Sequence, residues 1–396
     1  MAKAEKTFAA RQKATFLHKP VDRIVWQPRF SDWYYQNHVL QLRKEMNADQ
    51  IAKLVTKCPD LPRDIYGMEP WEIYDYLDAS PRYPSECWGG MSFFYDKGNT
   101  DADANIQHKT IIDDNGNWYH KITTPYGVLT ESRRAGSSYP DERILKKRED
   151  FKAVLYYIEN HTKEHLFNEN MYNIFLEVNE GRCVSVGGPW RSPYNKCIVE
   201  LAGTKNTMLL MKRYTKEFDE FCDELARINF EVIMPVEMNS PVEFISCGDN
   251  VDAMNNPPYV YEKYILPYFE RVAKECKRAG KFTFAHFDGH LHDLLPYLSN
   301  ERYPFDGIEA PTIKPQGDVT LEELRKALGD RIIVLDGIPS TIFLPHFTDE
   351  QFDKLVKDVL DAFAPNIILG VSDEYSPNGL FSRLKRVASI VEKFRT

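Results

Sequence analysis

The sequence predicts an α/β fold, a (β/α)8 TIM-type barrel with N-terminal helical and β-hairpin insertions. From residue 180 onward, apolar runs of strand length alternate with longer amphipathic stretches, which is typical of a parallel sheet covered by helices on both faces. Eight strand-sized runs favour a closed barrel over a doubly wound open sheet, and no GxGxxG or P-loop follows any of them. The eight runs are residues 24–27, 86–96, 183–186, 242–246, 282–285, 307–309, 332–335 and 367–370.

The remaining elements follow from periodicity and turn residues. A polar stretch at 5–20 predicts an N-terminal helix, and helical spacing continues through 31–80. Two short runs flank the turn Asn115-Gly116, which indicates a β-hairpin. We therefore expect one domain over 1–396, with an antiparallel insertion at 86–135. The later helices are expected at 213–238, 257–279, 320–328 and 349–363.

Composition excludes several classes of protein. The chain has 396 residues, of which 43% are hydrophobic, and a net charge of −9 without a basic stripe, so nucleic acid is not an expected partner. No apolar run reaches the length of a membrane span, and the N-terminus lacks the apolar core of a signal peptide. Seven scattered cysteines without CxxC spacing fit a reducing cytoplasm, which is the expected location.

Polar side chains follow most of the predicted strands. In a barrel the carboxyl ends of the strands meet at one mouth, where the chemistry of such folds is found. A single acid in this position is equally well explained as a helix N-cap or a loop residue, but six strands with polar ends indicate a site. The residues concerned are Gln27 and Arg29; Asp249 and Asn250; His286, Asp288 and His290; Glu309; Asp336; and Asp373 and Glu374.

His286 and Asp288 are spaced as on one face of a strand. An imidazole and a carboxylate there could bind one zinc ion, with Glu374 or Asp249 as the third ligand. A His–Asp pair that orients a loop, or an acid–base pair without metal, remains the alternative.

Several motifs, in order along the chain, resemble a known family. The chain is similar over most of residues 20–393 to the uroporphyrinogen decarboxylase-like superfamily, and nearer to its corrinoid-dependent methyltransferase branch than to the true decarboxylases. The resemblance implies a TIM-type barrel with a metal ligand at His286. The matching segments are Pro20–Trp26, Thr124–Leu129, Gly248–Asn250, His286–Leu291, Pro315–Asp318 and Leu369–Glu374.

The chain departs from its relatives in two places. True decarboxylases of this superfamily carry an arginine-rich segment that binds porphyrin carboxylates, whereas here only Arg29 is left in the segment 26–32. Relatives that methylate coenzyme M have His-x-Cys and a second cysteine near the last strand. This chain has Asp288 in the first motif and no cysteine in 370–374. Oxygen ligands make zinc a harder Lewis acid, which suits an oxygen leaving group better than a thiol.

We therefore expect a methyltransferase that demethylates a small methoxylated donor and transfers the methyl group to the Co(I) corrinoid, a cobalamin, of a carrier protein. Aromatic residues concentrated around 26–35 and 71–95 favour an aromatic donor. The expected catalytic residues are His286, Asp249, Glu374 and His290, and the expected zinc ligands are His286, Asp288 and Glu374. The expected substrate-binding residues are Trp26, Arg29, Asn250, Trp190 and Asp336, although core packing equally explains the two tryptophans.

Two alternatives remain open. One is a metal-independent decarboxylase or lyase in which Arg29 holds a small carboxylate and Asp249 stabilises developing positive charge. The other is a barrel that binds a ligand without catalysis, which is disfavoured because buried acids and histidines are costly unless they are used. The sequence does not identify the methyl donor, the direction of transfer, or whether the chain forms a homodimer.

Overall fold

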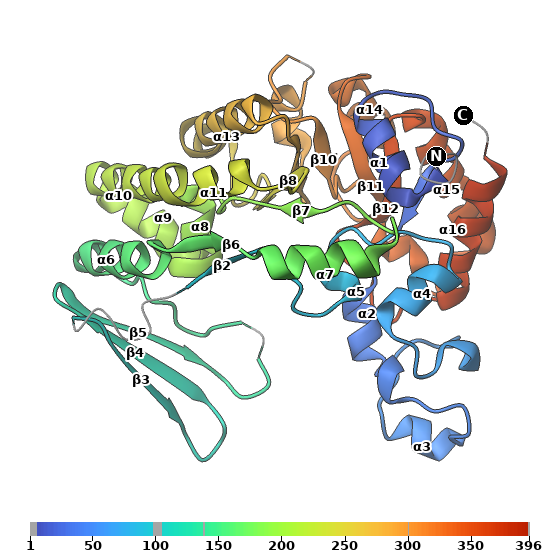
Figure 1. Cartoon of the computed structure of the whole chain (residues 1–396), viewed down its shortest axis with the longest axis horizontal. Coiled ribbons are helices and arrows are strands. Elements are labelled where there is room, and N and C mark those ends of the chain that lie inside the picture. Colours follow the sequence, from blue (N-terminus) through green and yellow to red (C-terminus); the bar gives the residue numbers. More distant parts are fainter. Residues whose placement is uncertain (1–5, 98–104, 138, 300, 395–396) are drawn as a thin grey trace.

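Seven parallel strands form one curled sheet at the centre of the molecule (Figure 1). The computed structural model describes residues 6–97, 105–137, 139–299 and 301–394. Every neighbouring pair in the sheet is parallel, in the circular order of a TIM-type barrel, so the predicted fold class is confirmed. The order is β1 (Val25–Gln27), β12 (Ile367–Ser372), β11 (Ile333–Pro339), β10 (Gly307–Glu309), β9 (Phe282–Phe287), β8 (Phe244–Val251) and β7 (Val186–Gly187).

The prediction that residues 86–96 supply a barrel strand is wrong. Residues 80–83 lie beside β1 instead: the Ser80 amide donates to the Trp26 carbonyl, and the Ser80 hydroxyl donates to the carbonyl of Arg182, just ahead of β7. Pro81 has no amide hydrogen to add to a ladder, so this segment forms no regular strand. Residues 86–96 contain the end of α5 (Pro84–Cys87) and β2 (Phe94–Asp96).

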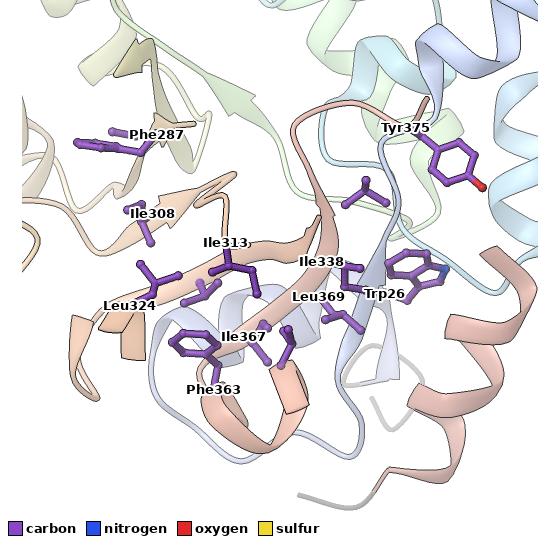
Figure 2. Close-up of a cluster of buried hydrophobic side chains, with 14 of the residues drawn as sticks. Trp26, Phe287, Ile308, Ile313, Leu324, Ile338, Phe363, Ile367, Leu369 and Tyr375 are labelled. Atoms are coloured by element: carbon purple, nitrogen blue, oxygen red, sulfur yellow. The ribbon is translucent and has the colours of Figure 1, made fainter. Parts of the chain in front are cut away.

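Helices surround the sheet and cover its outer face. Figure 2 shows Ile308 and Ile367 of two strands beside Leu324 and Phe363 of two helices, all of them buried. Two of these helices begin at the side chains of Thr320 and Thr348 in capping boxes, as the sequence pattern requires. The helices of the second half of the chain are α10 (Thr215–Ile228), α11 (Met234–Asn239), α12 (Pro258–Val260), α13 (Leu266–Arg278), α14 (Leu321–Leu328), α15 (Asp349–Phe363) and α16 (Phe381–Lys393).

The amino-terminal end of the barrel is closed by α1 (Phe8–Phe16). The Phe16 ring lies 4.9 Å from the ring of Phe244 and 5.7 Å from that of Phe282, and it joins the apolar cluster inside the sheet. The amino-terminal end of the barrel is therefore filled by apolar side chains. The other helices of the first half are α2 (Ser31–Gln36), α3 (Ala48–Ala52), α4 (Pro70–Tyr76), α6 (Phe151–Thr162), α7 (Glu169–Asn179), α8 (Pro193–Lys196) and α9 (Thr204–Arg213).

A separate three-stranded antiparallel sheet projects from the barrel at the lower left of Figure 1. It consists of β3 (Gln107–Ile112), β4 (Trp118–Thr124) and β5 (Gly127–Arg133), and its first turn contains Asn115-Gly116, so the predicted hairpin is present. A two-stranded sheet joins β2 to β6 (His165–Phe167). Within the described ranges, none of the helices has the length and apolar content needed to cross a lipid bilayer.

Candidate functional site

Inside the barrel, a layer of polar side chains lies next to a cluster of apolar ones, towards the carboxyl ends of the strands. Residues two apart on a strand point to the same face. The lower residue of each pair joins the inner apolar cluster, and the upper one is a polar group facing the mouth. The pairs are Val25 and Gln27, Phe244 and Ser246, and Phe284 and His286.

His286 is held by one ring nitrogen and leaves the other free. Its Nδ1 lies 2.9 Å from Oε2 of Glu309 on the neighbouring strand β10, and the two residues are paired in register. Its Nε2 is buried and has no hydrogen-bond partner among the described residues. Such an atom is costly to bury without a partner, which marks it as a ligand position.

Two carboxylates lie beside that free nitrogen. His286, Asp288 and Asp373 each offer a ligand atom, and all these atoms lie within 4.8 Å of one another. Oδ2 of Asp288 is 3.7 Å from Nε2, beyond hydrogen-bond range. One imidazole nitrogen and two carboxylate oxygens are a set that zinc accepts, so these residues fit a metal ion. The structure brings Asp373 to this group, where the sequence predicted Glu374.

Glu309 is the centre of a buried ionic network. Its Oε1 accepts hydrogen bonds from Nη1 of Arg82 at 2.7 Å and from the Tyr83 hydroxyl at 2.8 Å. Arg82 also donates to Oδ1 of Asp336 at 2.6 Å. Each of these carboxylates is at most 1% exposed, so one buried guanidinium pairs with two buried carboxylates.

These contacts set the charges around the site. Burial disfavours the charged imidazole, but the carboxylates of Asp288 and Glu309 outweigh it and raise the pKa of His286 to about 9. Burial alone would raise the pKa of Glu309, yet His286, Arg29 and Arg82 hold it well below its usual range. Glu309 is therefore ionised, and it fixes the orientation of His286.

Arg29 reaches the same mouth from β1. Its Nη2 lies 3.5 Å from Glu374 and its Nε 3.8 Å from Glu86, and its guanidinium lies over the Tyr83 ring. In the described chain, Nε and Nη1 are buried without a hydrogen-bond partner. Arg29 thus has unused donors. Glu374 lies against Arg29 with 44% of its side chain exposed, and it is not in the group with His286.

Asp249 is fully buried, and both of its carboxylate oxygens already accept hydrogen bonds. Oδ1 accepts from the Ser192 amide at 2.6 Å and Oδ2 from the Asn195 amide group at 3.2 Å. Burial raises the pKa of Asp249 to about 6. In this geometry Asp249 anchors the 192–195 segment, and its neighbour Asn250 accepts from Arg191.

The other predicted site residues are spread over different environments. Trp26 is 1% exposed within the outer hydrophobic core, and Asp336 is paired with Arg82. His290 is 57% exposed, with Nδ1 3.7 Å from Asp252. Trp190 lines a separate cavity beside the barrel, together with residues of β2, β6 and β7.

Comparison with known proteins identifies the family. The model of the uroporphyrinogen decarboxylase (URO-D) family matches residues 183–394, which is more than half of the chain. The chain belongs to this family. Its solved relatives include a methyltransferase from Methanosarcina mazei, with 14% identity, a TM-score of 0.55, and coverage of 98% of this chain and 99% of that one.

A likeness at that identity shows the shared fold. A B12-independent methionine synthase from Shewanella sp. W3-18-1 is similar at 11% identity and a TM-score of 0.44, over 94% of this chain and 98% of that one. No match was found among curated proteins.

In this URO-D family chain, the sequence did not point to Arg82 or Tyr83, and it indicated Glu309 and Asp373 only as polar strand ends. Arg82 lies between two prolines, at 81 and 84, in a segment without strand periodicity, so no local pattern pointed to it. Asp373 was visible in the motif 372–374, but its neighbour was preferred as the metal ligand. Glu309 follows an apolar run of only two residues, and its role depends on pairing with β9.

Proposed function

We propose that the protein is a methyltransferase that removes the methyl group of a small methoxylated, aromatic donor and passes it to the Co(I) corrinoid of a carrier protein. The observation that carries this proposal is the unpartnered Nε2 of His286 beside the carboxylates of Asp288 and Asp373. The group lies at the carboxyl ends of β9 and β12, the end from which the corrinoid of a partner would have to approach.

The chemistry of an ether requires such a group. The departing oxygen of a methyl ether develops negative charge, which must be neutralised for the bond to break. Zinc held by His286, Asp288 and Asp373 would supply a Lewis acid for that oxygen. Glu309 keeps the imidazole oriented, and Arg82 holds Glu309 in place.

Arg29 provides the means to orient the donor. Its unpartnered Nε and Nη1 can bind an anionic substituent, such as a ring carboxylate, at the same mouth. A methoxybenzoate would satisfy both requirements, with its carboxylate at Arg29 and its methoxy oxygen near His286.

The test mixes the protein with free cob(I)alamin and a panel of methoxybenzoates, methylamines and methanethiol. We expect methylcobalamin, followed by its absorbance, from at least one methoxybenzoate. His286→Ala should abolish the reaction, whereas the exposed control Glu322→Gln should leave the rate unchanged. If no donor of any class yields methylcobalamin, the methyl-transfer proposal fails.

The unused donors of Arg29 also favour a second candidate, a metal-independent decarboxylase acting on a small carboxylate. The same panel discriminates between the two. Release of carbon dioxide by EDTA-treated protein, lost in Arg29→Gln and retained in His286→Ala, would support decarboxylation. Absence of carbon dioxide would exclude it for these substrates.

A further inference from the structure

A second cavity of about 470 Å³ opens beside the barrel, away from the metal-ligand group. Its walls come from the segment after Arg82, from β2, β6 and the end of β7, and from α11, which carries Glu237. Strand β6 packs against α11, and Figure 1 shows β2 and β6 below β7. Met91, Phe94 and Val186 give the cavity an apolar side, and its volume is in the range of small-molecule sites.

Glu237 lines this cavity with an unsatisfied carboxyl group. The residue is 1% exposed, and its Oε2 has no hydrogen-bond partner in the described chain. Burial raises its pKa to about 8, although the Lys281 ammonium lowers it. A buried carboxyl without a partner costs stability, so a ligand that pairs with it would recover free energy.

His165 lines the same cavity and offers a second acceptor. Its Nδ1 lies 2.8 Å from Oδ1 of Asp96 on the paired strand β2, and the carboxylate can only accept, so Nδ1 carries the proton. In the neutral ring Nε2 is then an acceptor, and it too is buried without a partner among the described residues. The ring of Phe94 stacks on His165 at 5.8 Å and fixes its orientation.

The two unsatisfied groups define the ligand's chemistry. Both accept hydrogen bonds, and none of the lining residues that the structure describes is a lysine or an arginine. An anion would therefore find no lysine or arginine to pair with among the described lining residues, whereas the N–H groups of a cation would find an acceptor oxygen at Glu237 and an acceptor nitrogen at His165. We propose that this cavity is a binding site for a small organic ammonium compound, whose N–H groups donate to Glu237 and His165 and whose carbon skeleton packs on Phe94.

The site goes beyond the proposed methyl transfer and does not depend on it, but it is not remote from the barrel mouth. Tyr83 forms part of the cavity wall, and its hydroxyl donates to Glu309, which binds His286. A ligand in the cavity would thus lie two hydrogen bonds away from the metal-ligand group.

The test compares three probes of similar shape by isothermal titration calorimetry: phenethylamine, 2-phenylethanol and 3-phenylpropanoate. We expect the amine to bind at least about tenfold more tightly than the alcohol, and the acid to bind more weakly still. Glu237→Gln should remove the preference for the amine, whereas Glu322→Gln, an exposed glutamate on α14, should retain it.

His286→Ala separates this site from the proposed reaction. The amine preference should survive that change, because the ligand does not bind at the metal group. Loss of the preference in His286→Ala would assign amine binding to the metal group and overturn the proposal. Equal affinities for amine and alcohol, a preference that persists in Glu237→Gln, or no binding of the amine at millimolar concentration would each overturn it as well. Circular dichroism of each variant checks that it is folded.

Discussion

Arg82 pairs with two buried carboxylates at the bottom of the mouth, and this single residue connects strands that are far apart in the chain. It donates to Glu309 on β10 and to Asp336 on β11, and its Nε donates to Gln27 on β1. Removing this cation would leave both buried carboxylates without the guanidinium that pairs with them. Breaking a buried ion pair from one side is far more costly than losing a surface pair.

We expect Arg82→Met to lower the free energy of unfolding by about 3–5 kcal/mol, measured by urea denaturation. Arg227 is the control at the surface. It pairs with three acids, Glu159, Glu224 and Glu231, but 37% of its side chain is exposed. Arg227→Met should cost less than about 1 kcal/mol. Similar losses in the two variants would show that the buried network does not stabilise the fold as described.

The buried carboxyl group of Glu237 should make the stability of the protein depend on pH. Its pKa rises from 4.5 to about 8 on folding, so the native state binds its proton more tightly than the unfolded state. The stability it contributes is present below pH 4.5 and is lost as the pH rises towards 8, by roughly 1.4 kcal/mol per pH unit.

Glu237→Gln, which cannot ionise, should therefore become more stable than the native protein as the pH rises from 5 to 8. Urea unfolding at several pH values measures the difference between the two proteins. Glu322→Gln, which changes an exposed glutamate on α14, is the control for the loss of a surface carboxyl group. A constant gap between the native protein and Glu237→Gln would mean that Glu237 is not buried without a partner.

Among the elements, β11 and β12 pair through two glycines, Gly337 and Gly370, where the ionic network crosses them. The two strands are paired with Gly337 opposite Gly370, and Asp336 has a φ of +91°, a left-handed backbone conformation. A Cβ on Gly370 would lie 2.2 Å from Oδ1 of Asp336 and 2.7 Å from the Gln27 carbonyl oxygen. The absence of a side chain at this point of β12 is what allows Asp336 to turn inward to Arg82.

We expect Gly370→Ala to displace Asp336 and to cost about 1–3 kcal/mol, the usual penalty for overpacking. Gly248→Ala in β8 is the control, because its Cβ would meet nothing closer than 4.0 Å. Thermal unfolding followed by circular dichroism compares the two variants. A Gly370→Ala protein as stable as Gly248→Ala would show that the strands have room to separate.

For the whole molecule, the sequence predicted the parallel strands but not the segment that completes the ring. Seven of the predicted runs became barrel strands because each is apolar and flanked by turn or helix signals. The position beside β1 is taken by residues 80–83, where Pro81 prevents a regular ladder, so periodicity could not identify this segment.

The predicted third ligand differs from the structure by one residue for a similar reason. Continued alternation after β12 would place Glu374 on the same face as Ser372. Asp373 instead has a φ of +68°, which ends the alternation and leaves Asp373 itself beside His286. A reversal of this kind is set by the three-dimensional surroundings and leaves no periodic signal in the sequence.

A metal bound at the mouth would join the middle of the chain to its last strand. His286 and Asp288 belong to β9 and the loop that follows it, whereas Asp373 follows β12. A ligand that binds only the folded state stabilises it by an amount that grows with its concentration, about 4 kcal/mol at a thousandfold excess over the dissociation constant.

Zinc added to EDTA-treated protein should therefore raise the melting temperature, and Asp373→Asn should lose most of that rise. Asparagine tolerates the left-handed conformation at this position, so the backbone should be kept. Glu374→Gln is the matched control one residue away, and it should keep the full rise. If the rise in melting temperature were lost in Glu374→Gln and kept in Asp373→Asn, Glu374 would be the third ligand. If zinc did not raise the melting temperature of the native protein, zinc would have no part in the proposed function.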